Sequence, residues 1–213
     1  MGAVKRRGTA LALAVLTTLA LAGCGQTNIP SSDHRVYAPG GWEDDVYTSE
    51  FLGLRYTLPQ GWTHSTGEEL AAMAEENGQP PTEKQRGGDY SDATVIYEMA
   101  VQSEKGDGFF TLMVSNRSNA GDFTSTEEDI FRVFVEGIKS VYGEGGVEAG
   151  EAFDLPVGGK TFRVLPVSYS SGFLTQWNAL CFDGNFLYNI SLMVIGQDLT
   201  PQDLLDPFEA LPS

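Results

Sequence analysis

A pair of apolar runs joined by Asp183-Gly184 constrains the fold of this chain more than any other feature of its sequence. The runs cover residues 175–182 and 185–195, and a two-residue Asp-Gly connection is among the strongest signals for a β-hairpin. One face of the second run is entirely apolar: Phe186, Tyr188, Ile190, Leu192 and Val194. Its other face also carries Leu187, Met193 and Ile195, so we expect a central strand that is buried on both sides.

Other segments repeat the strand–turn–strand pattern. Residues 94–102 and 109–116 flank a polar turn at 104–108, and residues 147–155 and 160–168 flank Pro156-Val157-Gly158-Gly159. Near the start, residues 51–58 alternate with period two and predict a strand pair around Gly53 that ends at Pro59-Gln60-Gly61. Successive hairpins of this kind predict a mainly antiparallel sheet.

Three capping patterns predict helices between these strands. Ser65-x-x-Glu68 opens a helix that ends at Asn77-Gly78, and Ser125-x-x-Glu128 opens one that ends at Gly143. The second helix has an apolar face at three-and-four spacing, made by Ile130, Phe131, Phe134, Val135, Ile138, Val141 and Tyr142. Thr200, followed by Pro201 and by Asp203, opens a last helix with an apolar face of Leu204, Leu205 and Phe208.

The order of these elements predicts one α+β domain over residues 46–213, with a central, mainly antiparallel sheet flanked by helices. Its length suits a single core. Residues 79–93 are polar and unpatterned, so we expect a long surface loop there, a frequent place for binding residues.

The first 23 residues have the composition of a secretory signal peptide. Lys5-Arg6-Arg7 precedes an uncharged stretch over residues 8–22, which ends at Leu21-Ala22-Gly23-Cys24. These last four residues match the lipobox of bacterial lipoproteins, in which the cysteine receives a diacylglyceryl thioether and becomes the first residue after cleavage. Cys24 is therefore the expected lipid anchor, and the expected location is the extracytoplasmic face of the bacterial cell membrane.

Alternatives for the leader fit the residues less well. The uncharged run is shorter than the roughly 20 residues that a membrane-spanning helix needs. Arg6-Arg7 invites a twin-arginine interpretation, but the residues that follow lack a bulky apolar pair. Residues 24–45 are rich in Gly, Pro, Ser and acidic side chains, which predicts a flexible tether. In an organism with an outer membrane, Gly25 in place of an aspartate favours sorting to that membrane.

The charge of the chain excludes several classes of partner. The formal net charge is −16, and removal of the three basic residues of the leader leaves 10 − 29 = −19. Nucleic-acid binding depends on Lys and Arg that neutralise phosphates, so we expect none here. Electrostatic adhesion to anionic lipids is excluded for the same reason. Membrane attachment thus depends on the two acyl chains at Cys24, a number that suffices for stable anchoring. We expect a monomer.

Candidate catalytic residues are few. Lipidation of Cys24 leaves Cys181 without a partner for an intrachain disulfide, and its apolar setting predicts a small buried hydrophobe. Neither His34 in the tether nor His64 has the neighbours of a zinc site. His64 beside Glu68 is the one candidate acid–base pair, and a surface histidine near a helix start is the ordinary alternative. With no catalytic or cofactor motif in the sequence, we expect a protein that is not an enzyme and that holds no cofactor or metal.

Three groups of carboxylates raise the question of cation binding: Glu43-Asp44-Asp45, Glu127-Glu128-Asp129 and Asp89-x-x-Asp92. None has the spacing of a calcium loop, so we interpret them as solvated charge and as acidic residues at helix starts. Trp62 and Trp177 suit either a sugar or peptide pocket or the core, and we favour the core.

One stretch resembles a known family. The pattern Tyr47-x-x-x-Phe51-Leu52-Gly53-Leu54-x-Tyr56-x-Leu58-Pro59-x-Gly61-Trp62 is similar to the opening of PsbP-like and Mog-like domains, which include many lipoproteins of Gram-positive bacteria. The later Gly158-Gly159-Lys160 turn with paired apolar strands and a short terminal helix is similar too. The resemblance implies an α/β/α sandwich around a central antiparallel sheet and implies no activity.

Three hypotheses for function follow from the sequence. The first is a non-catalytic, membrane-anchored lipoprotein that binds a protein or another envelope component through its sheet or long loop. The second is an accessory subunit of a transporter or envelope system that captures a small ligand between the sheet and a helix. The third is a hydrolase that uses His64 and a carboxylate.

Overall fold

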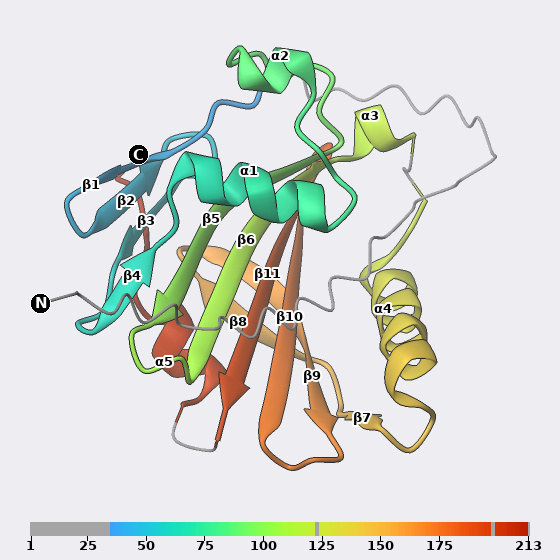
Figure 1. The fold of residues 1–213 in the computed structure, drawn as a ribbon. Coiled ribbons are helices and arrows are strands. Elements are labelled where there is room, and N and C mark those ends of the chain that lie inside the picture. Colours follow the sequence, from blue (N-terminus) through green and yellow to red (C-terminus); the bar gives the residue numbers. More distant parts are fainter. Residues whose placement is uncertain (1–34, 122–123, 197–198, 213) are drawn as a thin grey trace, which may run out of the picture.

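The computed structural model describes residues 35–121, 124–196 and 199–212. The chain forms two antiparallel sheets that pack face to face, with helices around them (Figure 1). This architecture confirms the predicted α+β class.

The larger sheet contains eight strands. Its path runs β4 (Trp62–His64), β5 (Val95–Ser103), β6 (Gly108–Asn116), β11 (Phe186–Ile195), β10 (Leu174–Asp183), β9 (Lys160–Tyr169) and β7 (Val147–Ala149), and β8 (Phe153–Val157) also pairs with β9. Each pairing is antiparallel. As predicted, β10 and β11 form a hairpin, and β11 lies between β10 and β6 at the centre of the sheet. The two-residue turn is Gly184-Asn185, one residue later than predicted, because Asp183 still pairs with Phe186.

The smaller sheet has the order β1 (Gly41–Glu43), β2 (Val46–Ser49), β3 (Leu54–Thr57) and β12 (Phe208–Ala210). It joins the two ends of the described chain, because β12 pairs with β3, where Ala210 lies opposite Leu54. Gly53 closes the β2–β3 turn with a φ of 67°, a conformation that glycine adopts without strain. This sheet covers the inner face of the large sheet, where the sequence had suggested a helical layer.

Five helices complete the fold: α1 (Gly67–Glu76), α2 (Glu83–Arg86), α3 (Arg117–Ala120), α4 (Glu127–Tyr142) and α5 (Pro201–Leu205). The long apolar face of α4 lies on the outer face of the large sheet, and α1 packs on β5 (Figure 1). The predicted ends of the first two long helices, at Asn77 and Gly143, are confirmed.

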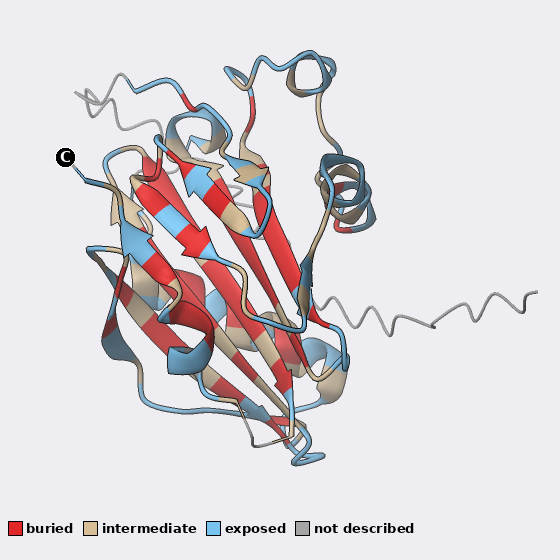
Figure 2. Cartoon of the chain, turned by 90° about the vertical axis from the view of Figure 1, so that its left-hand side faces the viewer, coloured by how far each residue is buried: buried red, intermediate tan, exposed pale blue. Residues whose placement is uncertain are grey.

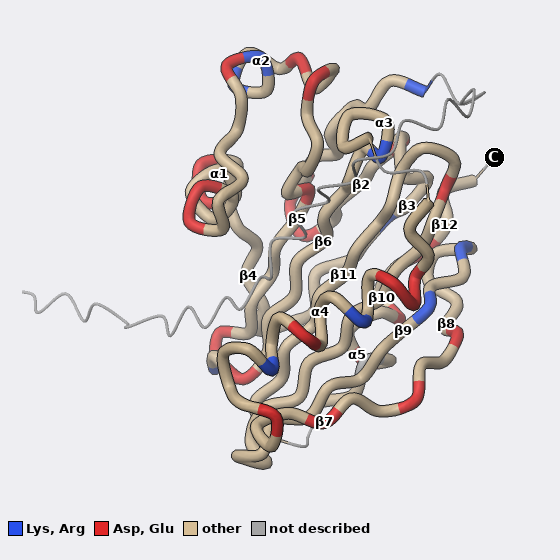
Figure 3. Tube along the Cα trace, turned by 90° about the vertical axis from the view of Figure 1, so that its right-hand side faces the viewer, with Lys and Arg blue, Asp and Glu red and all other residues tan. Residues whose placement is uncertain are grey.

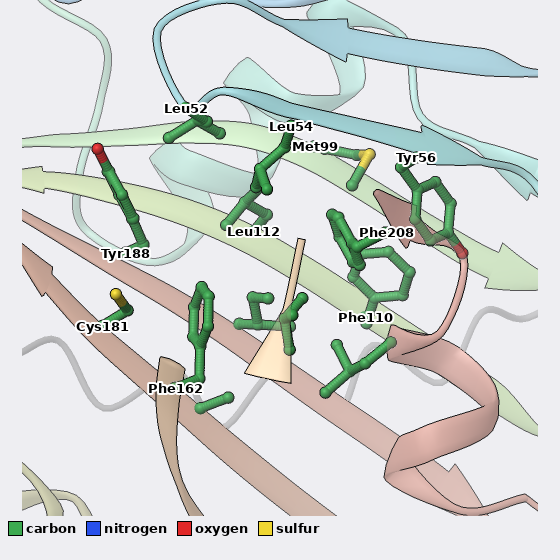
Figure 4. Close-up of a cluster of buried hydrophobic side chains, with 14 of the residues drawn as sticks. Leu52, Leu54, Tyr56, Met99, Phe110, Leu112, Phe162, Cys181, Tyr188 and Phe208 are labelled. Atoms are coloured by element: carbon green, nitrogen blue, oxygen red, sulfur yellow. The ribbon is translucent and has the colours of Figure 1, made fainter. Parts of the chain in front are cut away.

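Two hydrophobic cores lie on opposite faces of the large sheet. The inner core lies between the sheets and includes Tyr56, Phe110 and Phe208, whose rings contact one another (Figure 4). The outer core joins α4 to β9, β10 and β11 through residues such as Ile138, Leu165 and Leu187. Buried residues accordingly follow the strands of both sheets (Figure 2). Each fully buried large side chain contributes about 1.5–3 kcal/mol to folding.

Of the three predicted capping patterns, the one at Thr200 with Asp203 is confirmed, and the other two begin one residue later than predicted. Thr66 and Thr126 are the N-caps, with Glu69 and Asp129 as their reciprocal partners. At the first helix the reason is the neighbouring ladder. The N–H of Ser65 donates to the carbonyl of Ala100 at 2.9 Å, so Ser65 still continues the strand.

Three further segments differ from the sequence-based expectation. The expected loop 79–93 contains the short helix α2, capped by Thr82. Trp62 begins strand β4 rather than a loop. Phe208 belongs to β12 and not to the last helix, because Pro207 cannot continue a helix and the residue before a proline disfavours helical geometry.

Ordered structure also starts earlier than Val46. Tyr37 is buried, and its ring contacts those of Phe51 and Tyr90 at centroid distances of 5.1 and 5.0 Å. Strand β1 follows at Gly41. The residues from 35 to 45, assigned from composition to the tether, therefore pack on the domain, because the side chains of Tyr37 and Trp42 contact the inner core.

Candidate functional site

Polar side chains gather at the centre of the outer face of the large sheet. Side chains alternate along a strand, so the odd-numbered residues of β6 and β11 and the even-numbered residues of β10 share this face with Leu180 and Leu187 of the outer core. In the cross-strand register Ser191 lies opposite both Thr111 and Asn178. We call the following five residues the outer-face polar cluster: Thr111, Gln176, Asn178, Asn189 and Ser191.

Part of this cluster is held by hydrogen bonds. The hydroxyl of Tyr169 donates to Gln176 Oε1 at 2.8 Å, and Gln176 Nε2 donates to Ser191 Oγ at 3.0 Å. By contrast, Asn178 Nδ2 and Asn189 Oδ1 are buried atoms with no hydrogen-bond partner. Asn178 itself is only 5% exposed. One donor and one acceptor thus remain unused on neighbouring strands.

The cluster lies between two helices. To one side α1 packs on β5, and to the other α4 packs on Leu165, Val167 and Leu180. Along the ladders the cluster is bordered by residues with large, mainly apolar side chains: Tyr97, Phe109, Met113 and Met193. Polar groups surrounded by apolar and aromatic side chains are the usual composition of a small-molecule site.

The cluster is electrically neutral. Strands β6 and β11 contain no Lys, Arg, Asp or Glu, and the charged residues lie mainly on the helices and connections around them (Figure 3). Burial raises the pKa of Tyr169 to about 12, with Tyr142 acting in the same direction, so the hydroxyl at the edge of the network stays protonated. The arrangement can donate and accept hydrogen bonds but offers no group for proton transfer near neutral pH.

A second buried polar assembly lies on the inner side of the same sheet. A β-bulge between Tyr97 and Met99 turns the side chain of Glu98 inward, next to Met99. The hydroxyl of Tyr37 donates to Glu98 Oε2, while the hydroxyl of Tyr47 and the N–H of Gly40 donate to Oε1. We call this assembly of Glu98, Tyr37, Tyr47 and Gly40 the Glu98 clasp.

The clasp attaches the N-terminal segment to the sheet. Burial raises the pKa of Glu98 to about 7, and the N–H of Gly40 acts in the opposite direction. A Cβ at Gly40 would overlap the hydroxyl of Tyr47, so only glycine brings the backbone this close. Each carboxylate oxygen has a donor, and the segment from Tyr37 to Tyr47 is thereby held against β5.

A cluster around Asp183 holds the chain just before this segment, at Arg35. Lys160 Nζ lies 2.8 Å from Asp183 Oδ2, Arg35 contacts both carboxylate oxygens, and the hydroxyl of Tyr188 donates to Oδ2 at 3.0 Å. Burial acts to raise the pKa of Asp183, but the bonds from Lys160, Arg35 and Tyr188 outweigh it and lower the pKa to about 2.

The residues singled out in the sequence that the structure describes do not meet in one place. Cys24 and His34 lie outside the described residues. His64 lies on β4, where its ring stacks on Trp42 at 4.2 Å with an interplanar angle of 11°. Its Nδ1 is 3.3 Å from the carbonyl oxygen of Ser65. Cys181 is buried, as predicted, and burial raises the pKa of its thiol.

The candidate tryptophans and carboxylates contact groups that belong to the fold. Trp62 and Trp177 are partly buried and pack against the inner core, as predicted. Glu127, Glu128 and Asp129 form the first turn of α4. Asp89 accepts from the N–H of Ser91, and Asp92 accepts from the hydroxyl of Thr82. Within residues 35–121, 124–196 and 199–212, no three His, Cys, Asp or Glu side chains gather as a metal site.

Sequence reasoning missed the outer-face polar cluster, although a signal was present. Asn189 and Ser191 interrupt the otherwise apolar outer face of β11. The two-residue turn at Gly184-Asn185 sets the hairpin register, which places Asn178 opposite Ser191. Polar residues that coincide on one face of a buried hairpin are thus a signal that the sequence alone contains.

No helix in the described part of the chain is long and apolar enough to span a membrane. No family model and no curated protein matches the sequence.

Among solved structures, the chain is similar to cyanobacterial PsbP (CyanoP) from Synechocystis sp. PCC 6803, with 14% identity and a TM-score of 0.46 over 89% of this chain and 98% of that one. It is also similar to LpqN, involved in cell envelope biogenesis of Mycobacterium tuberculosis, with 12% identity and a TM-score of 0.37 over 75% of this chain and 83% of that one.

Proposed function

We propose that this protein is a non-catalytic lipoprotein, anchored at the extracytoplasmic face of the cell membrane through Cys24, that binds a neutral, polar component of the cell envelope. The leader and the lipobox support the location. The outer-face polar cluster supports the binding role and is the proposed site.

The observation that carries this proposal is the pair of unused hydrogen-bonding atoms, Asn178 Nδ2 and Asn189 Oδ1. A buried polar atom without a partner costs about 1–3 kcal/mol of stability, so these side chains are not explained by folding. A third such atom, the hydroxyl oxygen of Tyr56, stands alone among the aromatic rings of the inner core. The other two unpartnered atoms, by contrast, lie on neighbouring strands of the outer face, beside further polar groups.

Electrostatics determines the class of ligand. An anionic ligand needs cationic partners and a cation needs carboxylates, and strands β6 and β11 offer neither. Hydroxyl and amide side chains instead suit a neutral ligand, which they bind by directional hydrogen bonds.

Site-specific photo-crosslinking in the protein's own cells tests the binding role. A photoreactive phenylalanine at Met193, at the border of the cluster, should form an adduct with an envelope component. The same group at Thr57, exposed on β3 of the small sheet, is the matched control and should not. Equal adduct formation at both positions would contradict the assignment of the site.

The anchor has its own test. Cys24→Ser should release the protein from the membrane fraction without changing its circular dichroism spectrum. A substituted protein that sediments with the membranes as the natural chain does would refute lipid attachment at Cys24.

A transporter accessory subunit is the second candidate, because converging neutral groups beside apolar side chains also suit a small solute. Loss of the protein would then slow uptake of one solute, and an unchanged uptake profile across polar neutral solutes would remove this candidate. The crosslinked species distinguishes the two roles, since a solute adds only its own small mass.

A further inference from the structure

We propose that the outer-face polar cluster recognises a secondary amide in its ligand, the group found in N-acetylated sugars and in peptide bonds. This inference rests on the proposed binding role of the cluster and specifies the chemical group that the cluster binds.

The unused atoms have the complementary pattern. Asn178 Nδ2 is a free donor and Asn189 Oδ1 a free acceptor. A secondary amide offers a carbonyl oxygen for the first and an N–H for the second, on adjacent atoms. The match depends on the orientation of the two carboxamides, because rotation of one of them alone by 180° would present two donors or two acceptors.

Strand register places the two carboxamides at a suitable separation. Asn178 lies opposite Ser191, and Asn189 is two residues from Ser191 on the same face of β11. Diagonal neighbours of this kind are roughly 7–8 Å apart at the backbone. The C=O and N–H of a trans secondary amide point in opposite directions, so such a group would bond to both carboxamides by lying between them. A single hydroxyl, with donor and acceptor on one oxygen, would not reach both.

The surrounding residues leave these two side chains to the ligand. Gln176 is already bonded to Tyr169 and Ser191, so its carboxamide is a fixed part of the site. Met113 and Met193 border the cluster in the same register rows as Asn189 and Gln176. Their flexible, polarisable side chains suit the methyl of an acetyl group or the side chain next to a peptide bond.

Binding measurements on the purified full-length chain test the inference, with three probes. N,N′-diacetylchitobiose carries acetamido groups on a disaccharide, and N-acetyl-alanyl-alanine methylamide carries secondary amides without sugar. Cellobiose is the matched disaccharide without amides. We expect binding of at least one amide probe at least tenfold tighter than that of cellobiose, and the stronger of the two identifies the source of the amide.

Variants then localise the recognition. Asn178→Leu and Asn189→Leu should each weaken binding of that amide probe about tenfold, as expected for loss of one hydrogen bond in a buried site. Gln202→Leu, an exposed position on α5, is the matched control and should not. Because Leu replaces a side chain with an unpartnered atom, both cluster variants should fold, which circular dichroism checks.

Different results would contradict amide recognition and the proposed binding role. Amide recognition would be overturned by any of three results. These are equal affinity for cellobiose and the amide probes, no binding of the two amide probes, and amide binding that neither Asn substitution changes. An envelope adduct formed from position 193 but not from 57 would still support the binding role. Without that adduct, the binding role itself would fall.

Discussion

The two buried polar assemblies of the large sheet differ in what they do with their hydrogen bonds. The Glu98 clasp, on the inner face, contains an ionisable group, and each of its carboxylate oxygens meets a donor. The outer-face polar cluster contains only neutral groups, and two of its atoms have no partner. The cluster lies on neighbouring strands of the large sheet, whereas the clasp joins β5 of that sheet to β2 and to Tyr37 and Gly40.

The difference indicates opposite roles. The clasp connects β5 to the N-terminal segment and to the small sheet, so its hydrogen bonds hold distant parts of the chain together. The cluster lies within a single sheet whose strands are already joined by backbone hydrogen bonds, and its free atoms connect nothing. A satisfied buried network stabilises a fold, whereas an unsatisfied one calls for another explanation.

The largest effect should follow removal of the carboxylate from the clasp. At pH 5, Glu98→Ala leaves the hydroxyls of Tyr37 and Tyr47 and the N–H of Gly40 buried without an acceptor. Because each unsatisfied buried group costs about 1–3 kcal/mol, we expect a loss of about 3–5 kcal/mol in the free energy of unfolding. Urea denaturation followed by tryptophan fluorescence measures it. Glu98→Gln keeps an acceptor and should cost about 1 kcal/mol. Equal losses in both variants would contradict a hydrogen-bonding role for the carboxylate.

The clasp should also make stability depend on pH. The pKa of Glu98 is raised from 4.5 to about 7 in the folded protein, so the folded state holds this proton more tightly than the unfolded state. The resulting stability is complete below pH 4.5 and is lost as the pH rises through 7, by about 3 kcal/mol in total. The lowered pKa of Asp183 acts only at lower pH and leaves this window unaffected.

Denaturation at pH 5 and pH 8 measures the effect. The natural chain should be the less stable at pH 8, and Glu98→Gln should remove most of the difference. If the Gln variant keeps the full pH dependence, another group is responsible for it.

Two neighbouring residues of the outer-face polar cluster allow a direct comparison between a side chain whose hydrogen bonds are made and one with an unpartnered atom. Gln176→Leu leaves the Tyr169 hydroxyl and Ser191 without their partner and should cost about 1–3 kcal/mol. Asn178→Leu, two residues along the same face of β10, removes an unused donor and should be neutral or stabilise by about 1 kcal/mol. Thermal unfolding measures both. A cost for Asn178→Leu as large as that for Gln176→Leu would mean that Asn178 serves the fold.

The smallest loss of stability should follow removal of a hydrogen-bonded side chain at the surface. Thr66 caps α1 and accepts from the N–H of Glu69 at 3.3 Å, so Thr66→Ala should cost about 1 kcal/mol. Ser65→Ala is the control at the position that the sequence first suggested as the cap, and it should cost less. The reverse order of these two costs would place the cap at Ser65.

Much of the fold could be predicted from local patterns. Residues close in sequence determined the hairpin of β10 and β11, the central place of β11, the ends of the long helices and the buried state of Cys181. The predicted turn at Asp183-Gly184 would place Asn178 opposite Asn189, whereas the observed turn at Gly184-Asn185 places it opposite Ser191. In both registers the polar residues of the two strands share one face of the hairpin. The neutral character of the candidate site was therefore present in the sequence, in the polar residues that interrupt two apolar strands.

Only the tertiary structure decided the rest. The bulge at Glu98 has no local signature, and the donors that meet this carboxylate come from residues 51 to 61 positions earlier in the chain. The second sheet likewise depends on β12 pairing with β3 from the far end of the chain. Local propensity and turn chemistry act over a few residues and are visible in a sequence. Partners for buried polar groups and strand edges are chosen by packing between distant segments, which becomes visible only when the chain has folded.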